Sequence, residues 1–150
     1  MKAEFIEYLK AVGLTGETQL NQAKDAWRIS ALLCPEDLKD IFVEEHVRED
    51  GTREWDSLEA FCDRYWVSAV GFLTATPRYG ITYIGKFVKA YTVQSTEYDF
   101  NKATAKSRLN ITVGFMDHSA MGPSTLRASG DNCDVLMKMI GKYLKANMIG

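Results

Sequence analysis

Side chains that commonly carry out catalysis are few in this chain of 150 residues. The two histidines, His46 and His118, have no second histidine four residues away, no HExxH helix and no cysteine at metal-ligand spacing. The three cysteines, Cys34, Cys62 and Cys133, are widely separated and form no metal-like pair. We interpret the histidines as structural or surface residues and the cysteines as buried thiols of a reducing cytosol.

Motifs for phosphate binding and for nucleophilic catalysis are missing as well. The chain contains no GxSxG, no Walker loop and no GxGxxG, and the GPST segment at residues 122–125 is interpreted as a turn. Four clustered acids offer oxygen ligands for Ca²⁺ but lack the spacing of an EF-hand loop. These acids are Glu44, Glu45, Glu49 and Asp50. We therefore predict no metal site and no cofactor, and we do not expect an enzyme.

Basic and aromatic side chains alternate between residues 78 and 108. Exposed aromatic rings between cations can stack on nucleic-acid bases, whereas in a sheet the same rings would face the core and the lysines the water. The sequence pI of about 5.7 argues against nucleic acid as the main partner. The stretch is nevertheless the candidate binding surface. Its basic residues are Arg78, Lys86, Lys89, Lys102, Lys106 and Arg108.

The net charge of −2 conceals an asymmetry along the chain. Residues 1–63 hold 15 acids and 7 bases, a balance of −8, whereas residues 64–150 hold 5 acids and 11 bases, a balance of +6. Charge runs are usually solvated faces. The alternative is a basic face for an anionic partner or an acidic face used in self-association.

Composition indicates one globular domain, with 46% hydrophobic and 25% charged residues. No apolar run approaches the roughly 18 residues that cross a bilayer. The first ten residues carry charges throughout and lack the apolar region of a signal peptide. We expect a cytoplasmic protein without a transmembrane segment.

Two helices are expected before residue 35. Residues 3–12 place apolar side chains at helical spacing ahead of Gly13, and a second helix begins near Thr15 or Thr18 and ends before Pro35. The short link between them predicts a helical hairpin. Residues 35–40 (PEDLKD) are expected to add one helical turn.

Strands are expected after residue 40. Residues 41–47 are β-branched and aromatic, and Asp50-Gly51 is a strong hairpin signal. Residues 53–72 fit either strands or a helix, with strands favoured by aromatic content. Residues 81–100, with a bend at Gly85, and 108–115, with clean alternation, are predicted strands, followed by a loop at 116–122 and a shorter strand at 123–129.

An amphipathic helix is predicted from residue 131 to 148, with Asp131 or Asn132 as its cap. The order of elements predicts an α+β fold: an N-terminal helical hairpin at 1–38, then a strongly bent antiparallel sheet or barrel at 39–150 closed by a long C-terminal helix. We expect the two segments to form one compact unit.

From Ile41 to Leu144 this layout resembles bacterial pleckstrin-homology-like domains. The similar parts are the hairpin around DGT, the strand SRLNITVGF, and TLRASGDNCDVLMKMIGKYL, a last strand that runs into a closing helix. The resemblance implies a binding scaffold rather than an enzyme. Lipid-binding members use a basic loop between the first two strands, but here that loop, EDGTRE, has mixed charge. Phosphoinositide binding by that route is therefore not expected.

The leading hypothesis is a non-catalytic interaction domain that binds a protein partner or itself through a sheet edge or the face between helix and sheet. The alternative is a START-like or NTF2-like protein whose bent sheet encloses a small ligand, with or without enzymatic activity. A cavity of roughly 300 Å³ or more with converging polar groups would favour the alternative. A structural or assembly subunit is the third hypothesis.

Overall fold

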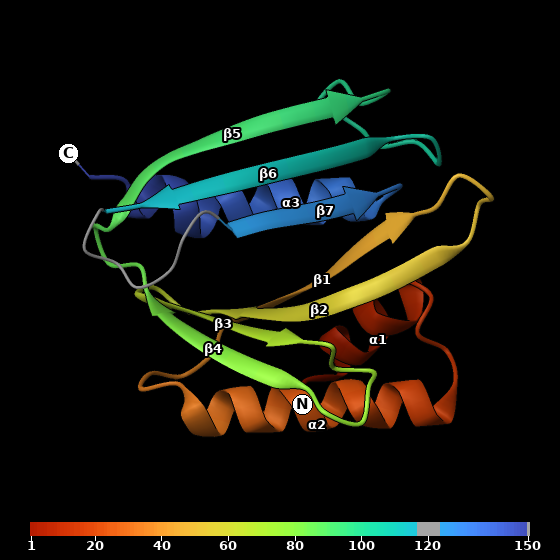
Figure 1. The fold of residues 1–150 in the computed structure, drawn as a ribbon, viewed down its shortest axis with the longest axis horizontal. Coiled ribbons are helices and arrows are strands. Elements are labelled where there is room, and N and C mark those ends of the chain that lie inside the picture. The colour runs from red at the N-terminus through yellow and green to blue at the C-terminus, as the bar shows by residue number, and fades with distance from the viewer. Residues whose placement is uncertain (117–123, 150) are drawn as a thin grey trace.

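The N-terminal segment is a helical hairpin, as predicted. The computed structural model describes residues 1–116 and 124–149, and begins with α1 (Ala3–Ala11) and α2 (Glu17–Leu33) (Figure 1). Gly13 between them has a φ of 105°, and a Cβ there would lie 2.8 Å from the Trp55 ring. Glycine therefore permits both the turn and the close approach of the hairpin to the first sheet.

The helical turn expected at residues 35–40 is wrong. Residues 34–39 form no helix, because the backbone is already extended at Cys34 and Lys39 donates its N–H to the carbonyl of Phe61 at 2.7 Å. This bond draws the segment alongside a strand before β1 begins.

Within the described part of the chain, the first sheet has four antiparallel strands in the order β1-β2-β3-β4. They are β1 (Asp40–Val47), β2 (Arg53–Phe61), β3 (Tyr65–Val70) and β4 (Arg78–Tyr83). The turn between β1 and β2 contains the predicted Asp50-Gly51 pair, with Gly51 at a φ of 87°. Residues 53–61 and 65–70 are strands, so the strand interpretation of residues 53–72 is confirmed and the helix is not formed.

The second sheet has three described antiparallel strands in the order β5-β6-β7. They are β5 (Val88–Thr96), β6 (Arg108–Phe115) and β7 (Ser124–Ser129). The alternation predicted for β6 is confirmed, since every second side chain from Leu109 to Phe115 is buried. Residues 117–123 lie outside the described part of the chain, and with them His118, most of the expected loop and half of the GPST turn.

The C-terminal segment is helical, but not as the long α-helix predicted. α3 (Asn132–Met139) continues as a π-helical turn at Ile140–Leu144 and a 3₁₀ turn at Lys145–Asn147. The apolar stripe is nevertheless buried. Neither Asp131 nor Asn132 caps α3 with its side chain, because Asn132 instead bonds to β1 and α1.

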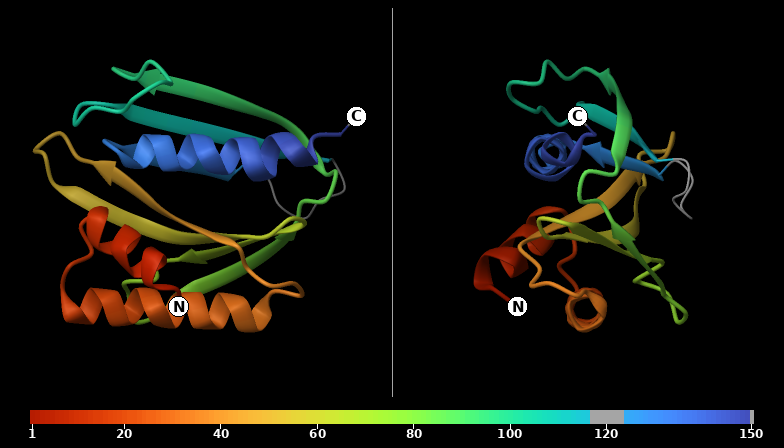
Figure 2. Two further views of the ribbon diagram at one scale, coloured as in Figure 1. Left: turned by 180° about the vertical axis from the view of Figure 1, so that it is seen from behind. Right: turned by 90° about the vertical axis from the view of Figure 1, so that its left-hand side faces the viewer.

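Two hydrophobic cores hold these layers together. One joins the second sheet, the C-terminal helical segment and aromatic residues of the first sheet, among them Phe61 stacked on Tyr143. The other lies between the helical hairpin and the opposite face of the first sheet, around Leu9 and Leu58. The first sheet is therefore covered on both faces, as the end view in Figure 2 shows.

The described strands form an α+β fold with two separate antiparallel sheets and no closed barrel. β1 lies next to β7, but side-chain ion pairs rather than a backbone ladder join the sheets there, which leaves the barrel open. None of the described helices has the length and apolar character needed to cross a membrane.

Candidate functional site

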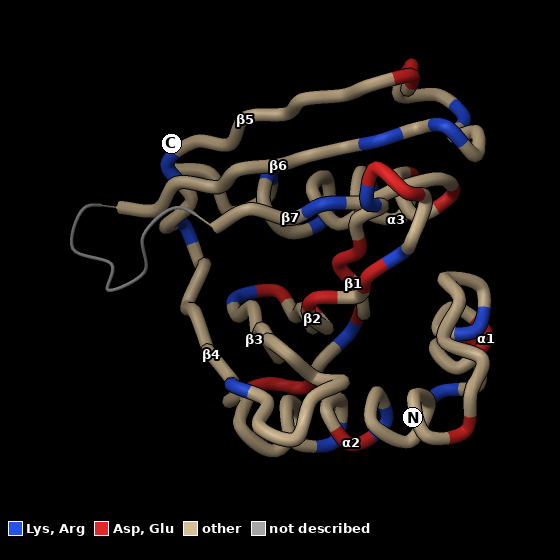
Figure 3. Tube along the Cα trace, turned by 45° about the vertical axis from the view of Figure 1, so that its right-hand side comes forward, with Lys and Arg blue, Asp and Glu red and all other residues tan. Residues whose placement is uncertain are grey.

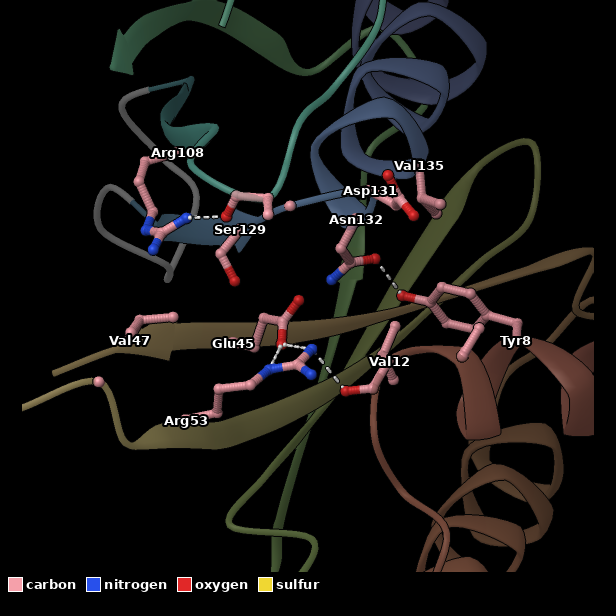
Figure 4. Close-up of a pocket in the computed structure, with 14 residues that line it drawn as sticks. Tyr8, Val12, Glu45, Val47, Arg53, Arg108, Ser129, Asp131, Asn132 and Val135 are labelled. Carbon is pink, nitrogen blue, oxygen red and sulfur yellow. Dashed lines mark hydrogen bonds and ion pairs between the residues drawn. The ribbon is translucent and has the colours of Figure 1, made fainter. Parts of the chain in front are cut away.

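A cavity of about 580 Å³, here called the Glu45 cavity, lies where the hairpin, the β1–β2 end of the first sheet and the start of α3 meet (Figure 4). Tyr8 comes from α1, Glu45 from β1, Arg53 from β2, Arg108 from β6, and Asn132 from α3. The volume lies within the roughly 300–1,000 Å³ typical of small-molecule sites. Tertiary folding thus gathers polar groups that are distant in sequence.

A β-bulge orients the side chains around this end of the first sheet. Glu44 lies opposite Ser57, whereas Glu45 lies opposite Trp55, so Asp56 is an extra residue on β2. Alternation along β1 then gives the two adjacent glutamates different surroundings. Glu44 accepts a hydrogen bond from Ser57 at 3.2 Å, on the side of the second sheet, while Glu45 enters the cavity beside the hairpin.

The Glu45 carboxylate is completely buried and only half bonded. Its Oε2 accepts hydrogen bonds from Arg53 Nη2 at 2.6 Å and Nε at 3.1 Å, and the same Nη2 donates to the Val12 carbonyl at 2.7 Å. Its Oε1 has no partner among the described residues. Figure 4 shows Oε1 directed away from Arg53, toward Ser129 and Asn132. A buried acceptor without a donor costs about 1–3 kcal/mol, so this oxygen favours a donor from outside the chain.

One wall of the cavity is fixed by a small hydrogen-bond network. The Tyr8 hydroxyl donates to Asn132 Oδ1 at 2.7 Å and accepts from the Val43 N–H at 2.8 Å. Asn132 Nδ2 donates to the Val43 carbonyl at 2.8 Å. Burial raises the pKa of Tyr8 well above its ordinary value, so the phenol stays neutral. The network holds α1, β1 and α3 at fixed positions around the cavity.

Arg108 supplies the remaining cation. Its Nη1 donates to the carbonyls of Ala105 at 3.0 Å and Ser107 at 2.8 Å, which anchor the half-buried guanidinium. Its other N–H groups have no hydrogen-bond partner within the described part of the chain. The cavity therefore offers an unpaired acceptor at Glu45 and free donors at Arg108. Asp131 also lines the cavity, so its two acids balance its two arginines.

No family model, curated protein or solved structure matches this chain. The geometry of its own residues is therefore what bears on its function.

A second cleft of about 420 Å³, here called the inter-sheet cleft, lies between the first sheet and β7. The Glu59 carboxylate is buried in its wall and accepts hydrogen bonds from Ser68 Oγ at 2.6 Å and Trp66 Nε1 at 3.2 Å. Burial raises the pKa of Glu59 to about 8, so it is largely protonated at neutral pH. Burial also raises the pKa of Glu44, although Arg127 opposes that rise.

His46, Glu54 and Asp56 place possible metal-ligand atoms within 4.8 Å of one another. His46 Nδ1 lies 2.7 Å from Asp56, and its Nε2 lies 3.1 Å from Glu54. The carboxylates are also paired with cations, Asp56 with Arg127 and Glu54 with Arg48. We interpret the cluster as an ion-pair network, because its ligand atoms already have partners.

The acids considered for Ca²⁺ do not converge. Glu44 and Glu45 bond to groups on opposite faces of β1, while Glu49 and Asp50 lie in the turn beyond. Asp50 accepts a hydrogen bond from the Thr52 N–H at 2.9 Å, as a turn residue does.

The basic residues predicted as a binding surface lie in three places rather than one. Lys86 and Lys89 are at the β4–β5 turn and the start of β5, and Lys86 Nζ donates to the Ala146 carbonyl at 3.0 Å. Lys102 and Lys106 are exposed in the β5–β6 connection, and Arg108, the first residue of β6, lines the Glu45 cavity. The sixth residue, Arg78, lines the inter-sheet cleft. Binding by these residues stays a prediction.

Sequence patterns marked Arg108 as a candidate binding residue, but they marked Glu45 only as a possible Ca²⁺ ligand, Asn132 only as a helix cap and Arg53 only as part of a loop of mixed charge. The signal available was weak: a glutamate at a strand position next to another glutamate. Which of the two would be buried depends on the bulge and on the position of the hairpin, neither of which is local.

Proposed function

We propose that this protein binds a small zwitterionic molecule in the Glu45 cavity. The observation that carries the proposal is Glu45 Oε1, a completely buried acceptor without a partner among the described residues at the wall of a 580 Å³ cavity. A ligand ammonium or other N–H group supplies the donor that this oxygen lacks. Because Glu45 is shielded from water, such a bond would be stronger than at the surface.

The remaining charges define the other end of the ligand. A carboxylate on the ligand can accept hydrogen bonds from the free N–H groups of Arg108. The two acids and two arginines of the cavity balance, which favours a ligand of zero net charge. Val12, Val47 and Val135 give the cavity an apolar surface for the body of the ligand. Amino acids and short peptides have this chemistry.

The experiment is isothermal calorimetry of the purified chain with a panel of amino acids and dipeptides, beside the matched amines and acids that lack one charge. We expect saturable binding of a zwitterion, weakened about tenfold or more when either charge is removed. Native mass spectrometry of the gently purified chain checks for a retained small molecule.

Two variants assign any binding to this cavity. Glu45→Gln should weaken binding about tenfold or more, whereas Glu49→Gln, in the exposed turn, should not. Glu45→Gln also removes the partner of Arg53, so a second variant is needed. Ala105→Trp fills the cavity from its exposed rim, and Lys106→Trp is its control. Equal binding by Ala105→Trp and the wild-type chain would exclude this site.

A protein-interaction domain remains the second candidate, supported by the open edge of the first sheet. Among the described strands β4 pairs with β3 alone, and Ile81 and Tyr83 on it are 40% and 43% exposed. An edge strand with apolar side chains can accept another strand. The succession of the described strands β1 to β7 and then α3 also favours the proposed pleckstrin-homology-like scaffold for residues 39–150. Sedimentation velocity of the wild-type chain and Ile81→Lys tests this candidate: a concentration-dependent assembly lost in the variant supports it.

A further inference from the structure

Two cysteines that are distant in sequence lie side by side at one end of the molecule. The Sγ atoms of Cys34 and Cys62 are 3.8 Å apart, although 28 positions separate them in the chain. Cys34 follows the last residue of α2, and Cys62 follows the last residue of β2. The contact therefore joins the N-terminal hairpin to the first sheet. Cys133 is completely buried in the core formed by the second sheet and the C-terminal helical segment, and it serves as an internal control thiol.

We propose that Cys34 and Cys62 form an oxidisable dithiol site, which a peroxide converts to an intramolecular disulfide. An S–S bond is about 2.05 Å long, so the two sulfur atoms need to approach by roughly 2 Å. Cys34 lies in the extended connection at residues 34–39, outside any helix or strand, and can supply that movement. This inference is independent of ligand binding in the Glu45 cavity.

The surroundings of the two thiols assign them different roles. Cys34 is partly exposed and therefore meets the peroxide first. Cys62 is 1% exposed, and its thiol lies 3.6 Å from Glu36 Oε1 and 3.7 Å from the Tyr65 carbonyl. Burial raises the pKa of Cys62 to about 11, which keeps it a thiol in the reduced protein. Cys62 is thus protected from direct oxidation but placed to attack an oxidised Cys34.

The chemistry balances with hydrogen peroxide as the oxidant. The Cys34 thiolate attacks one peroxide oxygen, an S–O bond forms, and the O–O bond breaks to release hydroxide, which takes the thiol proton as water. The Cys62 sulfur then attacks the Cys34 sulfur of the sulfenic acid: the S–S bond forms, the S–O bond breaks, and the leaving hydroxide takes the Cys62 thiol proton and departs as a second water. Two thiols lose two protons and two electrons in total, and one peroxide becomes two waters.

Thiol counting tests the proposal. The folded chain is treated with hydrogen peroxide, unfolded, alkylated with N-ethylmaleimide and weighed by intact-mass spectrometry. We expect one alkylated cysteine out of three, a peptide pair cross-linked between Cys34 and Cys62, and full reversal by dithiothreitol. Cys133→Ser should still form the cross-link, whereas Cys34→Ser and Cys62→Ser should not.

Several results would overturn the proposal. They are three alkylated thiols after treatment, a cross-link that involves Cys133, sulfinic acid at Cys34 as the main product, or a bond that forms only after unfolding.

Thermal unfolding of the oxidised chain gives an independent measure. A bridge that fits the folded geometry should raise the midpoint by several degrees, because it restricts the unfolded chain. A lower midpoint would show that the folded positions do not suit a disulfide.

Discussion

At the residue scale, burial gives the carboxylates of Glu45 and Glu59 different properties. Glu45 has one oxygen bonded to Arg53 and one without a donor, whereas Glu59 has hydrogen bonds from Ser68 and Trp66 but no cation among its hydrogen-bond partners. The first arrangement favours a ligand donor. The second favours a neutral carboxylic acid, because a buried charge without a counterion is costly.

Glu59 should make the stability of the protein depend on pH. The pKa of its carboxyl is about 8 in the folded chain and near 4.5 when unfolded, so the folded state holds the proton more tightly. The contribution of Glu59 to the free energy of unfolding is fully present below pH 4.5 and is lost as the pH rises toward 8. We expect the free energy of unfolding to fall by several kcal/mol over that range, measured by urea denaturation.

Glu59→Gln should remove most of this slope, because an amide resembles the protonated acid and does not titrate. Glu49→Gln, in the exposed turn, is the matched control and should keep the slope. A smaller slope should remain in Glu59→Gln, since burial also raises the pKa of Glu44. An unchanged slope in Glu59→Gln would mean that Glu59 is ionised in the folded protein.

At the element scale, Arg127 links the two sheets. This β7 side chain donates to Asp56 Oδ2 at 2.9 Å and to Glu44 Oε2 at 3.3 Å, both on the first sheet. The bulge places Asp56 on the same face as Glu44, so one guanidinium meets two carboxylates. Side-chain ion pairs thus connect the two sheets, as backbone hydrogen bonds connect the strands within each sheet.

Arg127→Met should therefore destabilise the fold by about 2–4 kcal/mol at neutral pH. Glu44 is only 8% exposed, and removal of Arg127 leaves it as a buried carboxylate without its cation. Arg78→Met, in the same cleft but exposed, should cost less than about 0.5 kcal/mol. Urea denaturation of both variants checks this. Equal stabilities would assign the contact between β1 and β7 to apolar packing alone.

At the scale of the whole molecule, the two differently charged halves interleave. Arg127 pairs with Glu44 and Asp56, and Lys142 of the C-terminal segment lies 2.7 Å from Asp40. Figure 3 shows basic positions on β7 beside acidic positions on β1 and β2. Part of the asymmetry between residues 1–63 and 64–150 is therefore neutralised inside the fold, and the small net charge describes the molecule better than either half does.

The helical hairpin should be indispensable to the sheet it covers. Phe5, Leu9 and Val12 pack on Ile41 and Leu58, which lie on the face of the first sheet opposite the other core. A chain that lacks residues 1–38 would expose this apolar face. We expect it to be insoluble or to unfold without cooperativity, as judged by circular dichroism on heating. A soluble chain of residues 39–150 with a sharp transition would establish that this segment folds without the hairpin.

The sequence by itself determined most of the elements. The alternation from Leu109 to Phe115, the Asp50-Gly51 turn and the residue before Pro35 each depend on neighbours a few positions away, and each is confirmed. Local steric and solvation preferences suffice for such features. The α+β class followed from their order. The exceptions are residues 34–39, where the backbone bond from Lys39 to Phe61 draws the segment alongside a strand, and the segment after Met139, which continues as a π-helical turn.

Only the tertiary structure decided where chemistry can occur. The partners of Tyr8 and of Cys34, the isolation of Glu45 Oε1 and the separation of Lys86 from Lys102 depend on contacts between residues that are distant in the sequence. Whether a polar side chain is solvated or buried without a partner is set by what packs over it from elsewhere in the chain. Residue types alone do not contain that information, because the cost of an unpaired group arises only when the fold excludes water from it.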